Sequence, residues 1–150
     1  MKNVRVLDCT LRDGGRIIDC AFDNQEILEI SNRLAEAKID IIEIGFLRDG
    51  RKVQYKGNST FFTDVEQIRP FINKENKNTI YAAFIDFGMC DIDNLKPFDG
   101  TSIDAIRFGF TKNNYDESKE EVVRWINIIR DRGYKLFIQG VNSLNYTDRE

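Results

Sequence analysis

Short apolar runs and helical patterns alternate along the whole chain, and this alternation does most to limit the folds that the chain can adopt. Five runs have the length and composition of strands, and they span residues 4–7, 41–46, 80–85, 105–108 and 136–141. The run at 41–46 is apolar on both faces, as a strand buried within a parallel sheet is. The sequence therefore predicts an α/β fold built around a parallel sheet.

Helical patterns fill the intervals between these runs. Residues 23–26 form a capping box, and apolar residues follow at helical spacing as far as Ala37. A second helix is predicted to begin at residues 63–66, and a single turn is predicted near residues 92–95. The most amphipathic helix is predicted over residues 117–132. Strand and helix therefore follow one another in units of roughly 30 residues.

These units are too few to close a barrel. Five of them fit within 150 residues, whereas a closed eight-stranded barrel takes about 250 residues. Residues 147–150 repeat the capping-box pattern, so a further helix is predicted where the sequence stops. We therefore predict that residues 1–150 supply about the first five β/α units of a (β/α)₈ TIM barrel, as the N-terminal part of its catalytic domain. A complete open, doubly wound sheet is the alternative.

Composition excludes several classes of function. The net charge is −3 and no basic stripe stands out, so no nucleic-acid partner is expected. No apolar run approaches the roughly 18 residues of a membrane span, and the N-terminus lacks the apolar core of a signal peptide. The 3 cysteines are unevenly spaced and suit reduced thiols. We therefore expect a cytoplasmic protein with no membrane partner.

The chain contains no histidine. It therefore cannot form a Ser-His-Asp triad, a histidine metal site or a histidine general base from its own residues. Cys9 is a candidate nucleophile or metal ligand, although a free cysteine usually serves as a small apolar filler.

Each predicted strand carries a polar residue near its carboxyl end. These residues are Asp8, Glu43, Asp86, Arg107 and Gln139. Because a parallel sheet buries both faces, their side chains must either converge on one polar patch or each find a separate partner. The carboxyl ends of parallel strands meet at one edge of the sheet, so we expect them to converge in one cleft.

The turn after the first strand holds a dense set of polar groups. Residues 8–15 contain two aspartates, a threonine and an arginine before two glycines. Arg12 beside Asp13 can hold an anionic substrate and a metal ion next to each other. An ion pair that only fixes the turn is the alternative for the same residues.

The connection between residues 47 and 62 exceeds the usual length of about two to six residues, and loops of this kind often cover a site. Its polar side chains include Arg48, Arg51, Lys52, Tyr55 and Lys56. They could form a cationic flap over an acidic substrate. A solvated surface loop is the alternative.

The turn after the first strand also carries a resemblance to a known family of enzymes. Residues 7–14, Leu-Asp-Cys-Thr-Leu-Arg-Asp-Gly, resemble the Asp-x-Thr-Leu-Arg-Asp-Gly signature of the family that holds 3-hydroxy-3-methylglutaryl-CoA lyase, isopropylmalate and homocitrate synthases, and 4-hydroxy-2-oxovalerate aldolase. Residues 42–46 look like the second strand of that family, and residues 139–143 suit its fifth. The resemblance implies a metal-dependent (β/α)₈ barrel that makes or breaks a carbon–carbon bond next to the carbonyl of a 2-oxo acid.

The resemblance also implies roles for individual residues. Arg12 would stabilise the enolate oxygen of the bound 2-oxo acid, with Glu43 as the second catalytic residue in the same polar cluster. Asp13 would ligate the divalent metal ion, Mn²⁺ or Mg²⁺. At the same edge of the sheet, Arg107 and Gln139 are expected to contact the small-molecule substrate.

Two departures from the family pattern bear on these roles. Gly15 stands where the synthases carry glutamate, which favours the aldolase-like branch. Arg16 stands where the aldolases carry a histidine base. The His-x-His metal pair of the family is absent from this chain, so we expect the chain alone to bind the metal weakly and to be inactive. A non-catalytic small-molecule-binding or regulatory module and an acyl-CoA-dependent synthase or lyase relative are the alternatives.

An unfinished barrel also predicts association between copies. The apolar residues meant for its interior would lack an opposite wall; they include Val6, Ile41, Phe84 and Phe137. Unpaired backbone groups would line its outer strands. We therefore expect a homo-oligomer, in particular a two-fold dimer in which each sheet covers the other.

Overall fold

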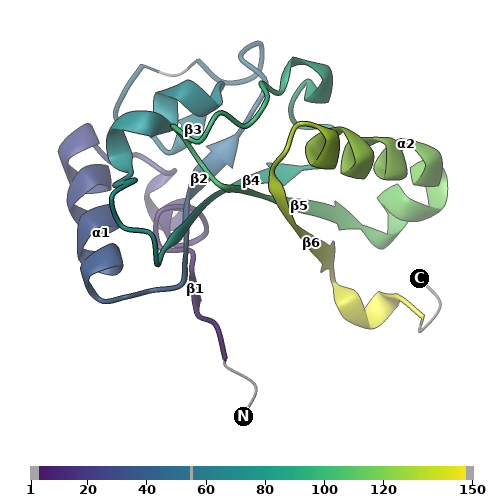
Figure 1. Cartoon of the computed structure of the whole chain (residues 1–150). Coiled ribbons are helices and arrows are strands. Elements are labelled where there is room, and N and C mark those ends of the chain that lie inside the picture. The colour runs from purple at the N-terminus through teal and green to yellow at the C-terminus, as the bar shows by residue number, and fades with distance from the viewer. Residues whose placement is uncertain (1–3, 55, 148–150) are drawn as a thin grey trace.

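The computed structural model describes residues 4–54 and 56–147. Its sheet has the strand order β1-β2-β4-β5-β6 with parallel pairings throughout, and β3 pairs with β2 beside this path (Figure 1). The strands are β1 (Leu7–Asp8), β2 (Ile41–Leu47), β3 (Phe61–Phe62), β4 (Ile80–Asp86), β5 (Ala105–Thr111) and β6 (Lys135–Val141). The helices are α1 (Asn24–Glu36) and α2 (Lys112–Asp131), with the 3₁₀ helices η1 (Gly14–Ile18), η2 (Val65–Phe71), η3 (Ile92–Asn94) and η4 (Ser143–Asn145). Tyr55 of the predicted flap and residues 148–150 of the predicted final helix lie outside the described residues.

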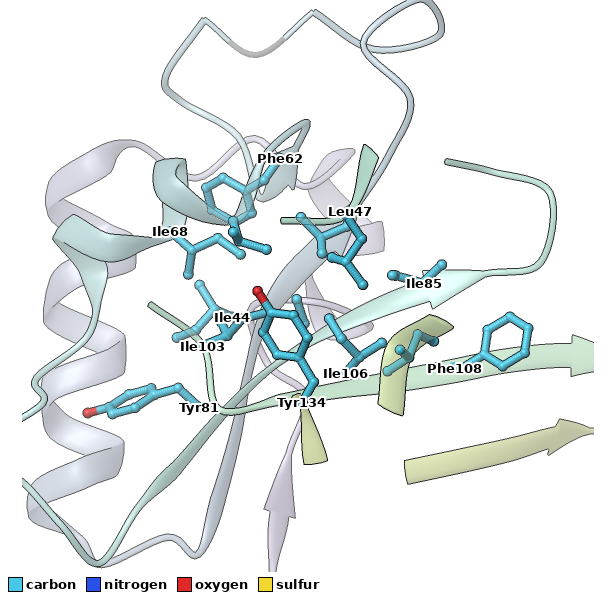
Figure 2. Packing of buried hydrophobic residues seen from close by; sticks show 14 of the residues in the cluster. Ile44, Leu47, Phe62, Ile68, Tyr81, Ile85, Ile103, Ile106, Phe108 and Tyr134 are labelled. Atoms are coloured by element: carbon cyan, nitrogen blue, oxygen red, sulfur yellow. The ribbon is translucent and has the colours of Figure 1, made fainter. Parts of the chain in front are cut away.

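The helices α1, α2 and η2 cover the same face of this sheet (Figure 1). Ile27 of α1, Ile68 of η2 and Trp125 of α2 are buried in one hydrophobic cluster. Figure 2 shows strand residues of that cluster, among them Ile44 of β2 and Phe108 of β5. A doubly wound sheet carries helices on both faces, so that alternative is wrong. The chain has an α/β fold in which a parallel sheet curls as part of a barrel, and the described strands do not close one.

Both long helices begin at capping boxes. At α1 the carboxylate of Asp23 accepts from the amide of Glu26, and the Glu26 carboxylate accepts from the amide of Asp23, each at 2.8 Å. This start is the predicted one. α2 begins earlier than predicted because Thr111 and Asn114 form a capping box of their own. The backbone departs from helical geometry at Ser118, close to the predicted start. No described helix is long and apolar enough to cross a membrane.

Two predicted elements differ from expectation, the first in length and the second in type. The first predicted strand is reduced to β1, and Val4 and Val6 before it are 87% and 51% exposed. The amide of Val6 donates to the carboxylate of Asp40 at 2.7 Å instead of to a strand. The second predicted helix is only the 3₁₀ helix η2, which Asp64 caps and which contains Pro70. Proline has no N–H to continue a helical hydrogen-bond pattern.

The other face of the sheet is the inner face of the curl. Ile41 and Phe84 are 6% and 2% exposed there, and Phe137 is half-buried. The prediction that the interior residues lack cover is therefore wrong for Ile41 and Phe84, whereas Val6 is exposed. The ring of Phe84 packs over Gly109, where a Cβ would lie 2.4 Å from Cζ of the ring. Association between copies stays a prediction.

Candidate active site at the carboxyl ends of the strands

A tight turn directly after β1 fixes the backbone of the candidate residues. The amides of residues 12–14 all donate to the carbonyl of Cys9, at 3.1, 2.8 and 3.1 Å. Asp8, at the end of β1, accepts from the amide of Thr10 at 2.9 Å and from its hydroxyl at 3.0 Å. Both carboxylate oxygens of Asp8 are therefore used within the turn, so this residue has a separate partner and does not join a shared patch.

The end of the long β2–β3 connection pins this turn against β2. Thr60 is fully buried, donates its hydroxyl to the carbonyl of Leu11 at 2.7 Å, and donates its amide to the carbonyl of Cys20 at 3.0 Å. Its own carbonyl accepts from the amide of Phe46 at 2.8 Å. This close approach requires glycine at position 45, since a Cβ on Gly45 would lie 2.2 Å from the Thr60 carbonyl oxygen.

Arg12, Glu43 and Arg107 meet in what we call the arginine–glutamate cluster. Nε of Arg12 donates to Oε2 of Glu43 at 2.5 Å, and Nη1 of Arg107 donates to the same oxygen at 3.3 Å. Their side chains are 6%, 0% and 20% exposed in the order 12, 43 and 107. A charge is costly to bury unless it is paired. Two guanidiniums around one buried carboxylate satisfy that carboxylate and keep positive charge beside it.

The surroundings set the protonation states in this cluster. Burial is the largest single influence on Arg12 and opposes its charge, but the charge and hydrogen bond of Glu43, together with Cys9 and Asp13, raise the pKa of Arg12. Cys9 lies with its Sγ 3.6 Å from Nη2 of Arg12 and 3.7 Å from Nη1 of Arg107. Burial, and then the charge of Glu43, raise the pKa of the Cys9 thiol to about 11. Since a nucleophilic cysteine needs a lowered pKa, Cys9 is a neutral thiol at pH 7 and is not poised as a nucleophile.

The guanidiniums of this site pack against aromatic rings. The guanidinium carbon of Arg12 lies 4.5 Å from the ring centre of Phe84 and 5.7 Å from that of Phe46. The guanidinium carbons of Arg16 and Arg48 lie 5.2 and 4.7 Å from the same Phe46 ring centre. A cation over an aromatic face is stabilised by about 0.5–2 kcal/mol, depending on how far it is desolvated. Phe46 is therefore the point at which three guanidiniums meet.

Asp13, the predicted metal ligand, is engaged by arginines. Its Oδ1 accepts from Nη1 of Arg12 and from Nε of Arg16, both at 2.9 Å, and its side chain is 57% exposed. No group of three or more cysteine or acidic side chains that could hold a metal ion occurs in the described part of the chain. Divalent cations such as Mg²⁺ and Mn²⁺ need several oxygen ligands. The described residues therefore do not fit a metal site by themselves.

Two further strand-end residues lie at this edge without joining the cluster. Gln139 of β6 is in register with Gly109, which lies two positions beyond Arg107 on β5, so it shares their face of the sheet. Its Oε1 is buried and has no hydrogen-bond partner among the described residues. Asp86 instead accepts from Nη2 of Arg48 at 2.9 Å. Of the five strand-end residues, Glu43 and Arg107 thus share a contact and the others have separate surroundings.

The predicted cationic flap does not form as one surface. Arg48 turns inward onto the rings of Phe46 and Phe61. Arg51 is 80% exposed and pairs with Asp49 of its own loop. The cationic side chains of this loop therefore have different partners, and Arg48 alone among those described joins the rings beneath the cluster.

A cavity of about 100 Å³ opens next to this loop, between the ends of β2 and β4 and the segments η2 and η3. Its apolar lining comes from Leu47, Val65, Ile85 and Leu95. None of the three residues of the arginine–glutamate cluster lines it. The sequence carried no signal for this cavity, because its walls come from separate segments that only the fold brings together.

Sequence reasoning also overlooked Phe46 and Thr60, which support the site, and placed Arg48 only in the flap. Phe46 and Arg48 are two positions apart at the end of β2, and the strand period alone places such a pair on one face. That signal was present in the sequence. Thr60 gave no such signal, because its partners Leu11 and Cys20 are distant along the chain and are brought to it by the fold.

The chain is similar to three curated synthases. It is 30% identical over 146 residues to a probable 2-isopropylmalate synthase of Methanosarcina acetivorans, which covers 95% of this chain and 27% of that protein. It is 26% identical over 137 residues to homocitrate synthase AksA of Methanocaldococcus jannaschii, over 89% of this chain and 32% of that protein. It is 44% identical over 46 residues to 2-isopropylmalate synthase of Geobacillus stearothermophilus, over 31% and 9% of the two chains. The chain spans less than a third of the length of these relatives.

No family profile matches the chain, and no solved structure matches it significantly. The three relatives are all named as synthases, so the likeness is to enzymes. They support the wider family that the sequence resembles, the DRE-TIM family, without singling out 4-hydroxy-2-oxovalerate aldolase. The chain is a homologue of the homocitrate and 2-isopropylmalate synthases.

Proposed function

We propose that the arginine–glutamate cluster binds a 2-oxo acid, and that the protein makes or breaks a carbon–carbon bond next to its carbonyl. One observation carries this proposal: Arg12, from the turn after β1, and Arg107 of β5 converge on the fully buried Glu43 of β2. Barrel enzymes place their chemistry beside the carboxyl ends of the strands, where the turn after β1 begins. The homology with the synthases supports the same class of reaction.

The cluster suits an oxyanion because some of its donors are not used. Arg107 donates only from Nη1 in its hydrogen bonds with the described residues, which leaves its Nε and Nη2 for a ligand. Breaking the bond next to the carbonyl places negative charge on the carbonyl oxygen as an enolate, and addition of an acyl-CoA enolate to the carbonyl places it on the same oxygen as an alkoxide. A guanidinium that is already fixed stabilises this charge without reorganising. Arg12 is the residue that we assign to the enolate, and Glu43 holds both guanidiniums in place.

Two reactions use this arrangement. Aldolase-like cleavage of a 4-hydroxy-2-oxo acid would give a pyruvate enolate, and it is supported by Gly15 and Arg16, which depart from the synthase pattern. Acyl-CoA-dependent condensation is the second candidate, and it is supported by the names of the curated relatives. Both reactions develop negative charge on the carbonyl oxygen of the 2-oxo acid and need a cation beside it, so both assign the same role to Arg12.

Arg12→Lys tests the proposal, because lysine keeps the charge and loses the planar guanidinium whose several fixed donors hold Glu43 and can meet the substrate oxygen. We expect affinity for pyruvate to fall by about tenfold or more, the effect of losing a charge-assisted hydrogen bond. Pyruvate titrations followed by NMR measure this affinity. Arg33→Lys is the matched control, since Arg33 is a surface residue that is 73% exposed. Unchanged affinity in Arg12→Lys would contradict the proposal.

We propose that a divalent metal ion joins this site with ligands from outside the described residues. Mn²⁺ or Mg²⁺ is expected to bind the 150-residue chain weakly, because the Oδ1 of Asp13 already accepts from Arg12 and Arg16. Titration calorimetry with Mn²⁺ measures this affinity. Tight binding of one ion per chain that Asp13→Ala abolishes would refute the expectation, since it would mean that Asp13 anchors a complete local ligand set.

A further inference from the structure

Arg48 has no role in the proposed function. Its side chain is 12% exposed, and its Nη2 donates to Asp86 at 2.9 Å. Its Nε is buried and has no hydrogen-bond partner among the described residues. Buried donors in native proteins nearly always have an acceptor. Arg48 therefore has a directional donor that an acceptor from outside these residues could satisfy.

The ring of Phe46 places Arg48 beside the arginine–glutamate cluster. The guanidinium carbons of Arg48 and Arg12 lie 4.7 and 5.7 Å from its centre. Stacking also on the Phe61 ring, at 5.6 Å, holds the plane of the Arg48 guanidinium. A ligand bound at Arg12 would therefore have Arg48 as a neighbour.

Arg16 is the third guanidinium at this ring, and it is also largely unused. In its hydrogen bonds with the described residues it donates only from Nε, to Asp13. Each guanidinium carries five N–H donors. Arg16 and Arg48 each meet one carboxylate through one nitrogen, so most of their donors face no acceptor among the described residues. Guanidiniums with free donors at the same ring are suited to carboxylate or phosphate oxygens.

We propose that Arg48, together with Arg16, binds a second oxoanion group of the substrate, a carboxylate or a phosphate, next to the cluster that binds its 2-oxo acid end. This inference rests on the proposed function and narrows the substrate to a 2-oxo acid with a second anionic group. It does not follow from the family pattern, in which the position of Arg16 belongs to a histidine in the aldolases.

Two ligands of equal chain length test the subsite. 2-Oxoglutarate and 2-oxovalerate differ in that the first ends in a carboxylate and the second in a methyl group. We expect the chain to bind 2-oxoglutarate about tenfold more tightly, and Arg48→Gln to remove this advantage while changing the affinity for 2-oxovalerate less than about twofold. Arg51→Gln is the matched control, because Arg51 is in the same loop and is 80% exposed. It should keep the advantage.

The Nε–H signals of the arginines provide a readout that needs no substitution. 2-Oxoglutarate should shift the Arg48 signal and 2-oxovalerate should not, and this difference tests the subsite even if Arg48→Gln does not fold. Inorganic phosphate is the second ligand to titrate. If phosphate shifts the Arg48 signal and the chain shows no preference for 2-oxoglutarate, the subsite is supported with phosphate as the group that it binds.

These measurements distinguish failure of the subsite from failure of the proposed function. Equal affinity for the two oxo acids, with no response to phosphate, overturns the subsite and leaves the proposed function standing. Arg48→Gln that weakens both oxo acids equally overturns it as well, because the residue is then a structural support. If neither oxo acid binds to the unsubstituted chain, the proposed function is overturned and the subsite with it.

Discussion

Replacing Glu43 by alanine is expected to lower the free energy of unfolding by about 3–5 kcal/mol, because it leaves two guanidiniums without the carboxylate that they share. Arg12 would keep its charge on a side chain that is 6% exposed. Arg107 would lose its contacts with both carboxylate oxygens of Glu43. Urea titration followed by far-UV circular dichroism at pH 7 measures the change.

Glu29→Ala is the control for this substitution. Glu29 pairs with Arg33 on the surface of α1, where the two side chains are 55% and 73% exposed. Losing such a pair is expected to change the free energy of unfolding by less than about 1 kcal/mol. An equally small loss in Glu43→Ala would be incompatible with a carboxylate that is fully buried between two guanidiniums.

Phe46→Ala is expected to produce the other large effect, a loss of about 3–5 kcal/mol in the free energy of unfolding. The ring is 1% exposed, and it lies 5.1 Å from the ring of Phe61 and 5.9 Å from the ring of Phe84, measured between centres. Its removal leaves a void on the inner face of the sheet and takes away the surface on which three guanidiniums stack. Urea titration measures the loss of stability.

Phe98→Ala separates this effect from the general cost of removing an aromatic ring. Phe98 is 40% exposed and contacts the ring of Tyr134, with ring centres 5.8 Å apart. Because less of its surface is withdrawn from water, the loss should be clearly smaller than at Phe46. Equal losses at the two positions would mean that Phe46 is no more than an ordinary contact.

The parts of the fold that follow from local chemistry could be predicted from the sequence. The capping box at Asp23 and Glu26 fixes the start of α1 through contacts three residues apart. The strand β2 is buried along its whole length, as its apolar residues on both faces indicate. The first strand could not be predicted in this way, because Val4 and Val6 have the composition of a strand but are 87% and 51% exposed.

The site was predictable in part. The contact between Glu43 and Arg107 was predicted, although both residues lie third in their seven-residue strands and not at the strand ends. The roles of Asp86 and Arg48 could not be predicted, since their pairing depends on how the chain turns after β2. The stacking of Arg12 on Phe84 is even harder to predict from the sequence, because these residues are distant in sequence and meet only across the curled sheet.

The position of β6 at the end of the sheet divides the site into parts of unequal local stability. In the described part of the chain β6 pairs only with β5, whereas β2, β4 and β5 each have a strand on both sides. Amides of β6 that point away from β5 lack a strand acceptor there, so we expect them to exchange their hydrogens earlier than the amides of β4 and β5. Gln139 lies on β6, and Glu43 and Arg107 lie on strands that are paired on both sides. Local opening of β6 would thus release Gln139 while Glu43 and Arg107 stay paired, and a ligand that contacts Gln139 would slow hydrogen exchange along β6.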